Sequence, residues 1–163
     1  MPLVKPIREP VDAYIAVGAN LGDALRMVQQ ALQALAQLPH TQLIATSSLY
    51  KSAPWQASGP TFINALAHIR TAMNAPDLLA ALQQTERAAG RVRGLQNAPR
   101  TLDLDVIFYG DAKIQSHWLT VPHPRWMERA FVLLPLQELA PRKVIPVMLH
   151  AVAEQPIEKL TGR

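Results

Sequence analysis

The spacing of apolar residues changes along the chain, and each spacing predicts a different element. Short apolar runs at 13–18 and 62–71 are typical of buried strands, and residues 43–50 form a further predicted strand. Between residues 24 and 38 apolar side chains recur every three or four positions. This spacing predicts an amphipathic helix that ends before Pro39.

The second half of the chain repeats this alternation. Pro76 is tolerated in the first turn of a helix, and Asp77 beside it favours the positive end of the helix dipole, so a helix is predicted from here to Gly90. Residues 91–100 form a basic loop, and residues 101–109 alternate apolar and acidic positions. This period of two predicts a strand.

The predicted order is strand, helix, strand, strand, helix, strand. It indicates an α+β fold, a ferredoxin-like split βαβ sheet (βαββαβ) with both helices packed on one face. Residues around 113–114 and 119–120 are expected to extend this sheet, and residues 128–139 to form a helix despite Pro135. The remaining residues form a C-terminal extension in this interpretation.

The composition limits the class of protein. Hydrophobic residues make up 49% of 163 residues and charged residues 17%, which suits one domain over 1–163 with a loose extension at 1–12. The longest apolar runs, such as 131–136, are far shorter than the roughly 20 residues that span a bilayer. The chain has no cysteine and no signal-like apolar run near Met1. We therefore expect a cytoplasmic protein with no membrane partner.

The net charge is +4, and basic residues gather in one part of the chain. Seven of them fall between positions 87 and 129: Arg87, Arg91, Arg93, Arg100, Lys113, Arg125 and Arg129. This clustering indicates a local site for an anion.

Asp103 and Asp105 lie within this basic region and are two residues apart on the last predicted strand. Residues at this spacing point to the same face, with Cα atoms about 6.5 to 7 Å apart, so the carboxylates can share a divalent cation. Two such acids alone are more often ordinary surface residues. Their combination with arginines suits phosphoryl transfer, which uses metal and cationic side chains together.

Four segments then resemble one family, the 6-hydroxymethyl-7,8-dihydropterin pyrophosphokinases. They are Ala16 to Gly22 (AVGANLG), Gly90 to Arg93 (GRVR), Pro99 to Asp105 (PRTLDLD) and Val121 to His123 (VPH). The resemblance implies an ATP-dependent diphosphotransferase of folate biosynthesis that transfers diphosphate from ATP to the hydroxymethyl group of the reduced pterin and releases AMP. It also implies two Mg²⁺ ions and small-molecule substrates, with no nucleic acid; we expect a monomer.

The resemblance also assigns residues. The implied catalytic residues are Arg91, Arg93, Arg100, Asp103 and Asp105, of which Asp103 and Asp105 would hold the metals. The implied ATP-binding residues are Arg91, Arg93, Arg100, Val106, Thr120, His123 and Arg129. The implied pterin-binding residues are Ser52, Ala53, Trp55, Phe62, Asn64, Glu86, Asp103 and Phe131.

One departure from the family's pattern concerns closure of the site. Asn97 stands where the family carries a loop tryptophan, so the chain closes its site through Trp55 or Trp126, or closes it less tightly. Segments 52–60 and 91–99 are the expected lids. Two other functions are open at this point: a metal-dependent nucleotide hydrolase with the same acids and arginines, and a ferredoxin-like RNA-binding module.

Overall fold

A computed structural model of the chain describes residues 8–20, 23–53, 61–91 and 102–161, without the side chains of Gly90 and Arg91. The strands are β1 (Val11–Ala19), β2 (Thr41–Thr46), β3 (Tyr50–Ser52), β4 (Phe62–Thr71), β5 (Asp103–Tyr109), β6 (Ile114–Gln115), β7 (Thr120–Val121) and β8 (Ile157–Lys159). The α-helices are α1 (Ala24–Leu35), α2 (Ala75–Arg91), α3 (Ala130–Leu139) and α4 (Pro146–Ala151). Single 3₁₀ turns occupy Trp126–Glu128 (η1) and Pro141–Lys143 (η2).

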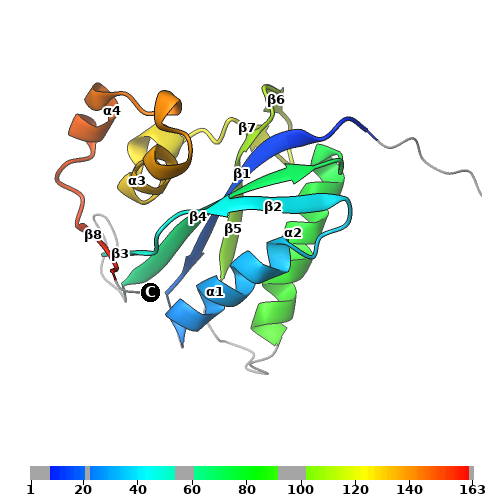
Figure 1. The fold of residues 1–163 in the computed structure, drawn as a ribbon, viewed down its shortest axis with the longest axis horizontal. Helices are drawn as coiled ribbons and strands as arrows, with labels where there is room; N and C mark the ends of the chain where they lie inside the picture. Colours follow the sequence, from blue (N-terminus) through cyan, green and yellow to red (C-terminus); the bar gives the residue numbers. More distant parts are fainter. Residues whose placement is uncertain (1–7, 21–22, 54–60, 92–101, 162–163) are drawn as a thin grey trace, which may run out of the picture.

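Six strands form an antiparallel sheet with helices on both faces, which confirms the mixed helix and strand class (Figure 1). The strand order is β5-β1-β4-β3-β8, and β2 also pairs with β4. The expectation that residues near 113 and 119 extend this sheet is wrong. In the described part of the chain, β6 and β7 pair with each other as a separate two-stranded ribbon.

One face of the sheet is closed by α1 and α2. The apolar stripe of α1 buries Val28, Leu32 and Leu35 against the sheet, and α2 adds Leu78 and Leu82. Each helix also has a capped start, because Asp23 accepts a hydrogen bond from the Arg26 N–H at 3.2 Å and Asn74 accepts one from Asp77 at 2.8 Å. The sequence predicted both helices and the face they cover.

The opposite face is only partly closed by α3, which packs Leu133 and Leu136 against Leu66 and Phe108. Figure 1 shows α3 and α4 on this side and α1 and α2 on the other. The predicted helix over 128–139 begins two residues later, at Ala130, because residues 126–128 form the 3₁₀ turn η1. The sequence did not predict β8, which joins the far edge of the sheet.

The predicted strand over 43–50 is divided into β2 and β3. Between them, Ser47 hydrogen bonds Leu66 twice: its N–H donates to the Leu66 carbonyl at 2.9 Å, and its hydroxyl accepts from the Leu66 N–H at 2.9 Å. A side chain thus replaces one backbone partner at this point of the sheet. The chain can then change direction into β3 without leaving a buried N–H unpaired.

A β-bulge lies in the middle of β5. Tyr14 pairs with Phe108 and Ile15 pairs with Val106, so Ile107 is an additional residue on β5. Ile107 and Phe108 consequently both pack in the cluster beneath α3. The Ile107 carbonyl accepts a hydrogen bond from the His123 N–H at 2.9 Å, which fixes the segment after β7 beside the strand.

Polar contacts fasten α3 to the far edge of the sheet. Glu138 accepts a hydrogen bond from the Ser48 N–H at 2.8 Å and another from the Tyr50 hydroxyl, and Lys159 lies 3.9 Å away. Burial acts to raise the pKa of Glu138, but these hydrogen bonds outweigh it and leave the pKa lowered.

None of the helices in the described segments has the length and apolar character needed to cross a membrane.

Candidate active site

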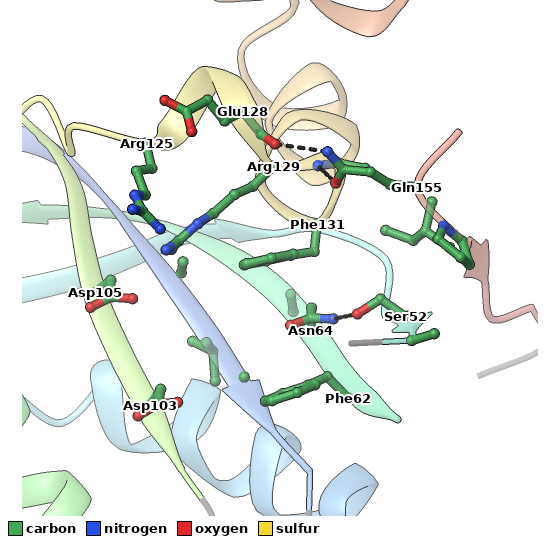
Figure 2. Close-up of a pocket in the computed structure, with 18 residues that line it drawn as sticks. Ser52, Phe62, Asn64, Asp103, Asp105, Arg125, Glu128, Arg129, Phe131 and Gln155 are labelled. Carbon is green, nitrogen blue, oxygen red and sulfur yellow. Dashed lines mark hydrogen bonds between the residues drawn. The ribbon is translucent and has the colours of Figure 1, made fainter. Parts of the chain in front are cut away.

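A cavity of about 540 Å³ lies where α3 leaves the sheet face uncovered (Figure 2). Its walls come from β1, β3, β4 and β5 on the sheet side and from η1, the start of α3 and residues 155–157 at the start of β8 on the other. The lining residues are Ala16, Val17, Gly18, Ser52, Ala53, Phe62, Asn64, Ala65, Asp103, Asp105, Arg125, Glu128, Arg129, Ala130, Phe131, Gln155, Pro156 and Ile157.

Asp103 and Asp105 lie on the cavity side of β5, as their spacing predicts. The residues between and beyond them, Leu104 and Val106, are 5% and 3% exposed and pack beneath α1 and α2. Asp103 is half-buried and Asp105 is exposed. Strand alternation therefore separates two carboxylates from the apolar core beneath them.

Small residues of β1 make room beside the acids. Gly18 pairs with Asp103 on one side and with Asn64 on the other, and Ala16 pairs with Asp105. A Cβ atom at Gly18 would lie 3.1 Å from the Asn64 Oδ1 atom. A larger residue at position 18 would therefore press on the Asn64 amide and occupy space between it and Asp103.

Asn64 supplies a buried amide at one end of the cavity. It is 4% exposed, and its Nδ2 donates a hydrogen bond to the Ser52 hydroxyl at 2.7 Å. Figure 2 shows the rings of Phe131 and Phe62 on the two sides of a gap beside this amide. An amide at the edge of a gap between aromatic faces suits a flat heterocycle with hydrogen-bonding groups on its rim.

Two guanidinium groups occupy the other end. Arg125 precedes η1 and Arg129 precedes α3, and Figure 2 shows their side chains converging above Asp105. The Arg129 guanidinium also lies 5.4 Å from the centre of the Phe131 ring. Within the described residues neither arginine forms an ion pair, so both charges are available to an anionic ligand.

His123 contacts the backbone of this cationic end but does not line the cavity. Its Nδ1 accepts a hydrogen bond from the Arg125 N–H at 3.0 Å, so that nitrogen carries no proton in this arrangement. Burial lowers the pKa of His123, Arg129 and Arg125 lower it further, and Asp105 opposes the shift. Through the 3.0 Å hydrogen bond, the imidazole supports the backbone at Arg125.

The structure brings most of the described predicted residues together. Eight line the cavity: Ser52, Ala53, Phe62, Asn64, Asp103, Asp105, Arg129 and Phe131. The structure places Val106 in the core beneath the helices and Thr120 on β7, and neither side chain lines the cavity. Glu86 accepts a hydrogen bond from the Leu104 N–H at 2.7 Å, which ties α2 to β5.

Several predicted residues lie outside the described part of the chain. They are Trp55, Arg93, Arg100, Asn97 and the side chain of Arg91. Most of each expected lid, 52–60 and 91–99, lies outside it too. Trp126 is described, and its ring packs edge-on against Phe108 with the centroids 5.0 Å apart. Trp126 is therefore partly buried against the core beneath α3 and does not line the cavity.

The sequence interpretation missed Gly18, Arg125 and Gln155 as lining residues. Gly18 lies inside the AVGANLG segment, and Arg125 is one of the clustered basic residues, so each had a signal in the sequence. Gln155 had none, because it belongs to a C-terminal segment with no recognisable motif.

The fold and the cavity define a small-molecule-binding α/β protein that offers ligands to both cations and anions. The family model of 7,8-dihydro-6-hydroxymethylpterin-pyrophosphokinase (HPPK) matches residues 14–141. The chain is 42% identical over 156 residues to 2-amino-4-hydroxy-6-hydroxymethyldihydropteridine pyrophosphokinase of Pseudomonas aeruginosa, covering 91% of this chain and 96% of that protein. The enzyme of the same name from Haemophilus influenzae is 43% identical over 137 residues, covering 83% and 86%. This chain belongs to the HPPK family.

Solved structures show the same fold. A crystal structure of an HPPK-DHPS in complex with substrates matches with a TM-score of 0.72 at 12% identity, over 94% of this chain and 47% of that one. The Plasmodium falciparum HPPK-DHPS with pterin and p-hydroxybenzoate matches with a TM-score of 0.64 at 13% identity, over 82% and 40%. The chain thus spans less than half of these longer proteins.

Proposed function

We propose that this chain transfers a diphosphate group from ATP to the hydroxymethyl group of 6-hydroxymethyl-7,8-dihydropterin and releases AMP, a step in folate synthesis. Family membership supports this activity. The observation that carries it is the cavity itself, which has an amide and two aromatic rings at one end, and a pair of carboxylates and two guanidinium groups at the other. One end suits a flat heterocycle, and the other suits phosphates with a metal.

In this proposal the pterin lies between Phe62 and Phe131, and the Asn64 amide reads its rim. The 2.7 Å hydrogen bond from the Asn64 Nδ2 to the Ser52 hydroxyl holds the plane of that amide in place. Ala53 lines the same end. Trp55 and Glu86 stay proposed pterin contacts on the resemblance alone.

The phosphates of ATP lie at the cationic end, against Arg129. Arg91, Arg93 and Arg100 are proposed to add further positive charge from the loop that follows α2. Val106, Thr120 and His123 stay proposed nucleotide contacts, and the Val106 side chain could not contribute directly because it is 3% exposed on the other face of the sheet.

The carboxylates of Asp103 and Asp105 fit Mg²⁺. This cation is usually held by one or two carboxylates together with substrate phosphates and water, and two carboxylates on one strand face provide such a set. In the described segments no third His, Asp, Glu or Cys joins them, so the remaining ligands would come from ATP and water. We propose two bound ions, which when present neutralise the triphosphate charge and polarise its oxygens.

The reaction we propose is an in-line attack of the pterin hydroxyl oxygen on the β-phosphorus of ATP. The bond between the hydroxyl oxygen and the β-phosphorus forms as the bond between the β-phosphorus and the oxygen bridging to the α-phosphorus breaks. AMP leaves with that bridging oxygen, and the hydroxyl proton is released to solvent. The side chains bind and orient both substrates, and Arg129 stabilises negative charge that develops on the phosphate oxygens. No general base is assigned, because His123 does not line the cavity and its Nδ1 accepts the Arg125 N–H.

Other features are part of the same proposal. We propose one domain whose β1 to β5 core is a ferredoxin-like split βαβ unit, supported by the antiparallel order β5-β1-β4 with β2 and β3 beyond β4. We also propose a monomer in the cytoplasm. The RNA-binding alternative needs an open sheet face, and α3 packs on that face here.

Product analysis tests the function. Protein, Mg²⁺, ATP labelled in its β-phosphate and the hydroxymethyl pterin are incubated, and the expected products are AMP and labelled pterin diphosphate. ADP as the sole nucleotide product would refute the diphosphate transfer. Equal ATP turnover without the pterin would favour the nucleotide hydrolase.

A further inference from the structure

A single side chain holds the backbone on both sides of Arg129. The Gln155 Oε1 accepts a hydrogen bond from the Ala130 N–H at 2.9 Å, and its Nε2 donates to the Glu128 carbonyl at 2.8 Å. Figure 2 shows both bonds, which leave Arg129 between two fixed peptide groups. Each amide atom of Gln155 is therefore used for one neighbour of Arg129.

The backbone at Arg129 depends on these two hydrogen bonds because no nearby side chain caps the start of α3. It is the N-cap residue of α3, in an extended conformation with φ −123° and ψ 115°, and its own side chain makes no capping hydrogen bond. The Arg129 side chain points into the cavity instead. Gln155, distant in sequence, satisfies one of the helix N–H groups that a capping side chain usually satisfies.

Gln155 is itself held by the edge of the sheet. The next residue, Pro156, accepts a hydrogen bond from the Ala53 N–H at 3.3 Å, and Ile157 of β8 pairs with Ser52 of β3. Ser52 in turn accepts the Asn64 hydrogen bond. Residues 155–157 thus connect the heterocycle end of the cavity with its cationic end.

We propose that Gln155 is a positioning residue that acts through Arg129, orienting its guanidinium toward the phosphates of the nucleotide. This inference rests on the proposed function. It assigns a role at the cavity to the C-terminal segment, which is absent from the 14–141 span of the family match. The two Gln155 hydrogen bonds also fix the start of α3, from which Phe131 extends. Their loss should therefore lower pterin affinity as well, but by less than it lowers nucleotide affinity.

The test uses Gln155→Met, which keeps the length of the side chain and removes both hydrogen bonds. The dissociation constant for α,β-methylene ATP with Mg²⁺ should rise about tenfold, as expected for two lost hydrogen bonds that orient a charged group. Pterin affinity, measured separately by fluorescence, should fall about two- to threefold. Asn74→Ala is the matched control, because it removes the cap of α2 away from the cavity.

Coupling to Arg129 separates positioning from general destabilisation. Arg129→Met alone should weaken the nucleotide analogue about 30-fold, the scale of a lost charge-assisted contact. In that background, Gln155→Met should add less than about a twofold further loss. Asn74→Ala should lower the melting temperature similarly and leave both affinities unchanged.

A Gln155→Met protein with wild-type nucleotide affinity would overturn the inference, and so would full additivity with Arg129→Met. If Gln155→Met does not fold, Gln155→Asn carries the same comparison, because it is shorter by one methylene and cannot span both partners. The proposed function has a separate failure: the wild-type protein would then not form pterin diphosphate. Nucleotide affinities of the variants remain measurable in that case and still decide the role of Gln155.

Discussion

The two faces of the sheet use the same strands for different purposes. Beneath α1 and α2, Ile15, Leu104 and Val106 fill a closed apolar core. On the other face, the neighbouring positions Ala16, Gly18 and Asp103 leave a cavity beside α3. Residues one position apart therefore belong to regions with opposite requirements, one for close packing and the other for space and charge.

Substitutions on the two faces should therefore differ in whether they change stability or activity. A change on the helix-covered face removes packing and should lower stability without altering the site. A change on the cavity face should alter binding or turnover with little effect on unfolding. Four experiments challenge this separation, starting with the largest expected effect.

Asp105→Asn should abolish most of the activity and preserve the fold. Removal of one of two metal-binding carboxylates is expected to lower turnover about 10³-fold, or about 4 kcal/mol in barrier height. The melting temperature should change little, because repulsion from Asp103 is also relieved. Steady-state rates across a Mg²⁺ series measure the effect. Asp111→Asn, at an exposed position in the turn after β5, is the charge-matched control and should remain active.

Leu104→Ala tests the other face of the same strand. Its side chain is 5% exposed, so truncation should cost about 3 kcal/mol of unfolding free energy by leaving a cavity. Denaturant unfolding gives this value, and turnover per folded molecule should stay near wild type. Ile44→Ala on β2, where the side chain is 42% exposed, should cost less than about 1 kcal/mol. A large loss of turnover per folded Leu104→Ala molecule would contradict the separation of the faces.

Two glycines, one in the cavity and one in a turn, should respond differently to substitution by alanine. In Gly18→Ala the new methyl group would meet Asn64 Oδ1 at 3.1 Å, so pterin affinity should fall about tenfold, or about 1.4 kcal/mol, with little change in stability. Gly110 has φ +53°, and Gly110→Ala should instead cost about 1 kcal/mol of stability through backbone strain. Calorimetric pterin titration and thermal melts should give opposite rankings of the two variants.

The smallest effect concerns pH. Because the folded-state pKa of Glu138 is lowered, its contribution to stability is present above the unfolded-state pKa and is lost as pH falls through the folded-state value. Glu138→Gln should therefore lower the unfolding free energy at pH 7, and this difference from wild type should shrink as pH falls below the ordinary glutamate pKa of 4.5. Unfolding free energies across pH for both proteins provide the measurement. An unchanged difference from pH 7 to pH 3 would show that the fastening of α3 is not ionic.

Much of the fold was predictable because the spacing of apolar residues and the helix-capping residues indicate the same elements within short segments. The α1 stripe, the Asn74 cap of α2 and the alternation in 101–109 each indicate one element without reference to distant residues. The division of 43–50 was not predictable in this way, since Ser47 reads as an ordinary strand residue. Its hydroxyl takes a partner on β4 that only the assembled sheet provides.

The site shows the same limit. Asp103 and Asp105 could be placed from spacing alone, and the family resemblance supplied Asn64, Phe62 and Phe131. The bulge at Ile107 has no local signal, because it depends on the pairing of β5 with β1. Gln155 is likewise invisible in the sequence, since its role depends on β8 reaching β3 across more than one hundred residues.

The pairing of β3 with β8 also has a consequence for synthesis on the ribosome. Residues 50–52 emerge early and residues 157–159 late, so this contact is among those of highest sequence separation in the sheet. The acids and the Asn64 amide can take their places before Gln155 has been translated. A nascent chain can therefore form its sheet core before residues 155–157 join the cavity, and we expect its full affinity for the proposed substrates only after β8 has paired with β3.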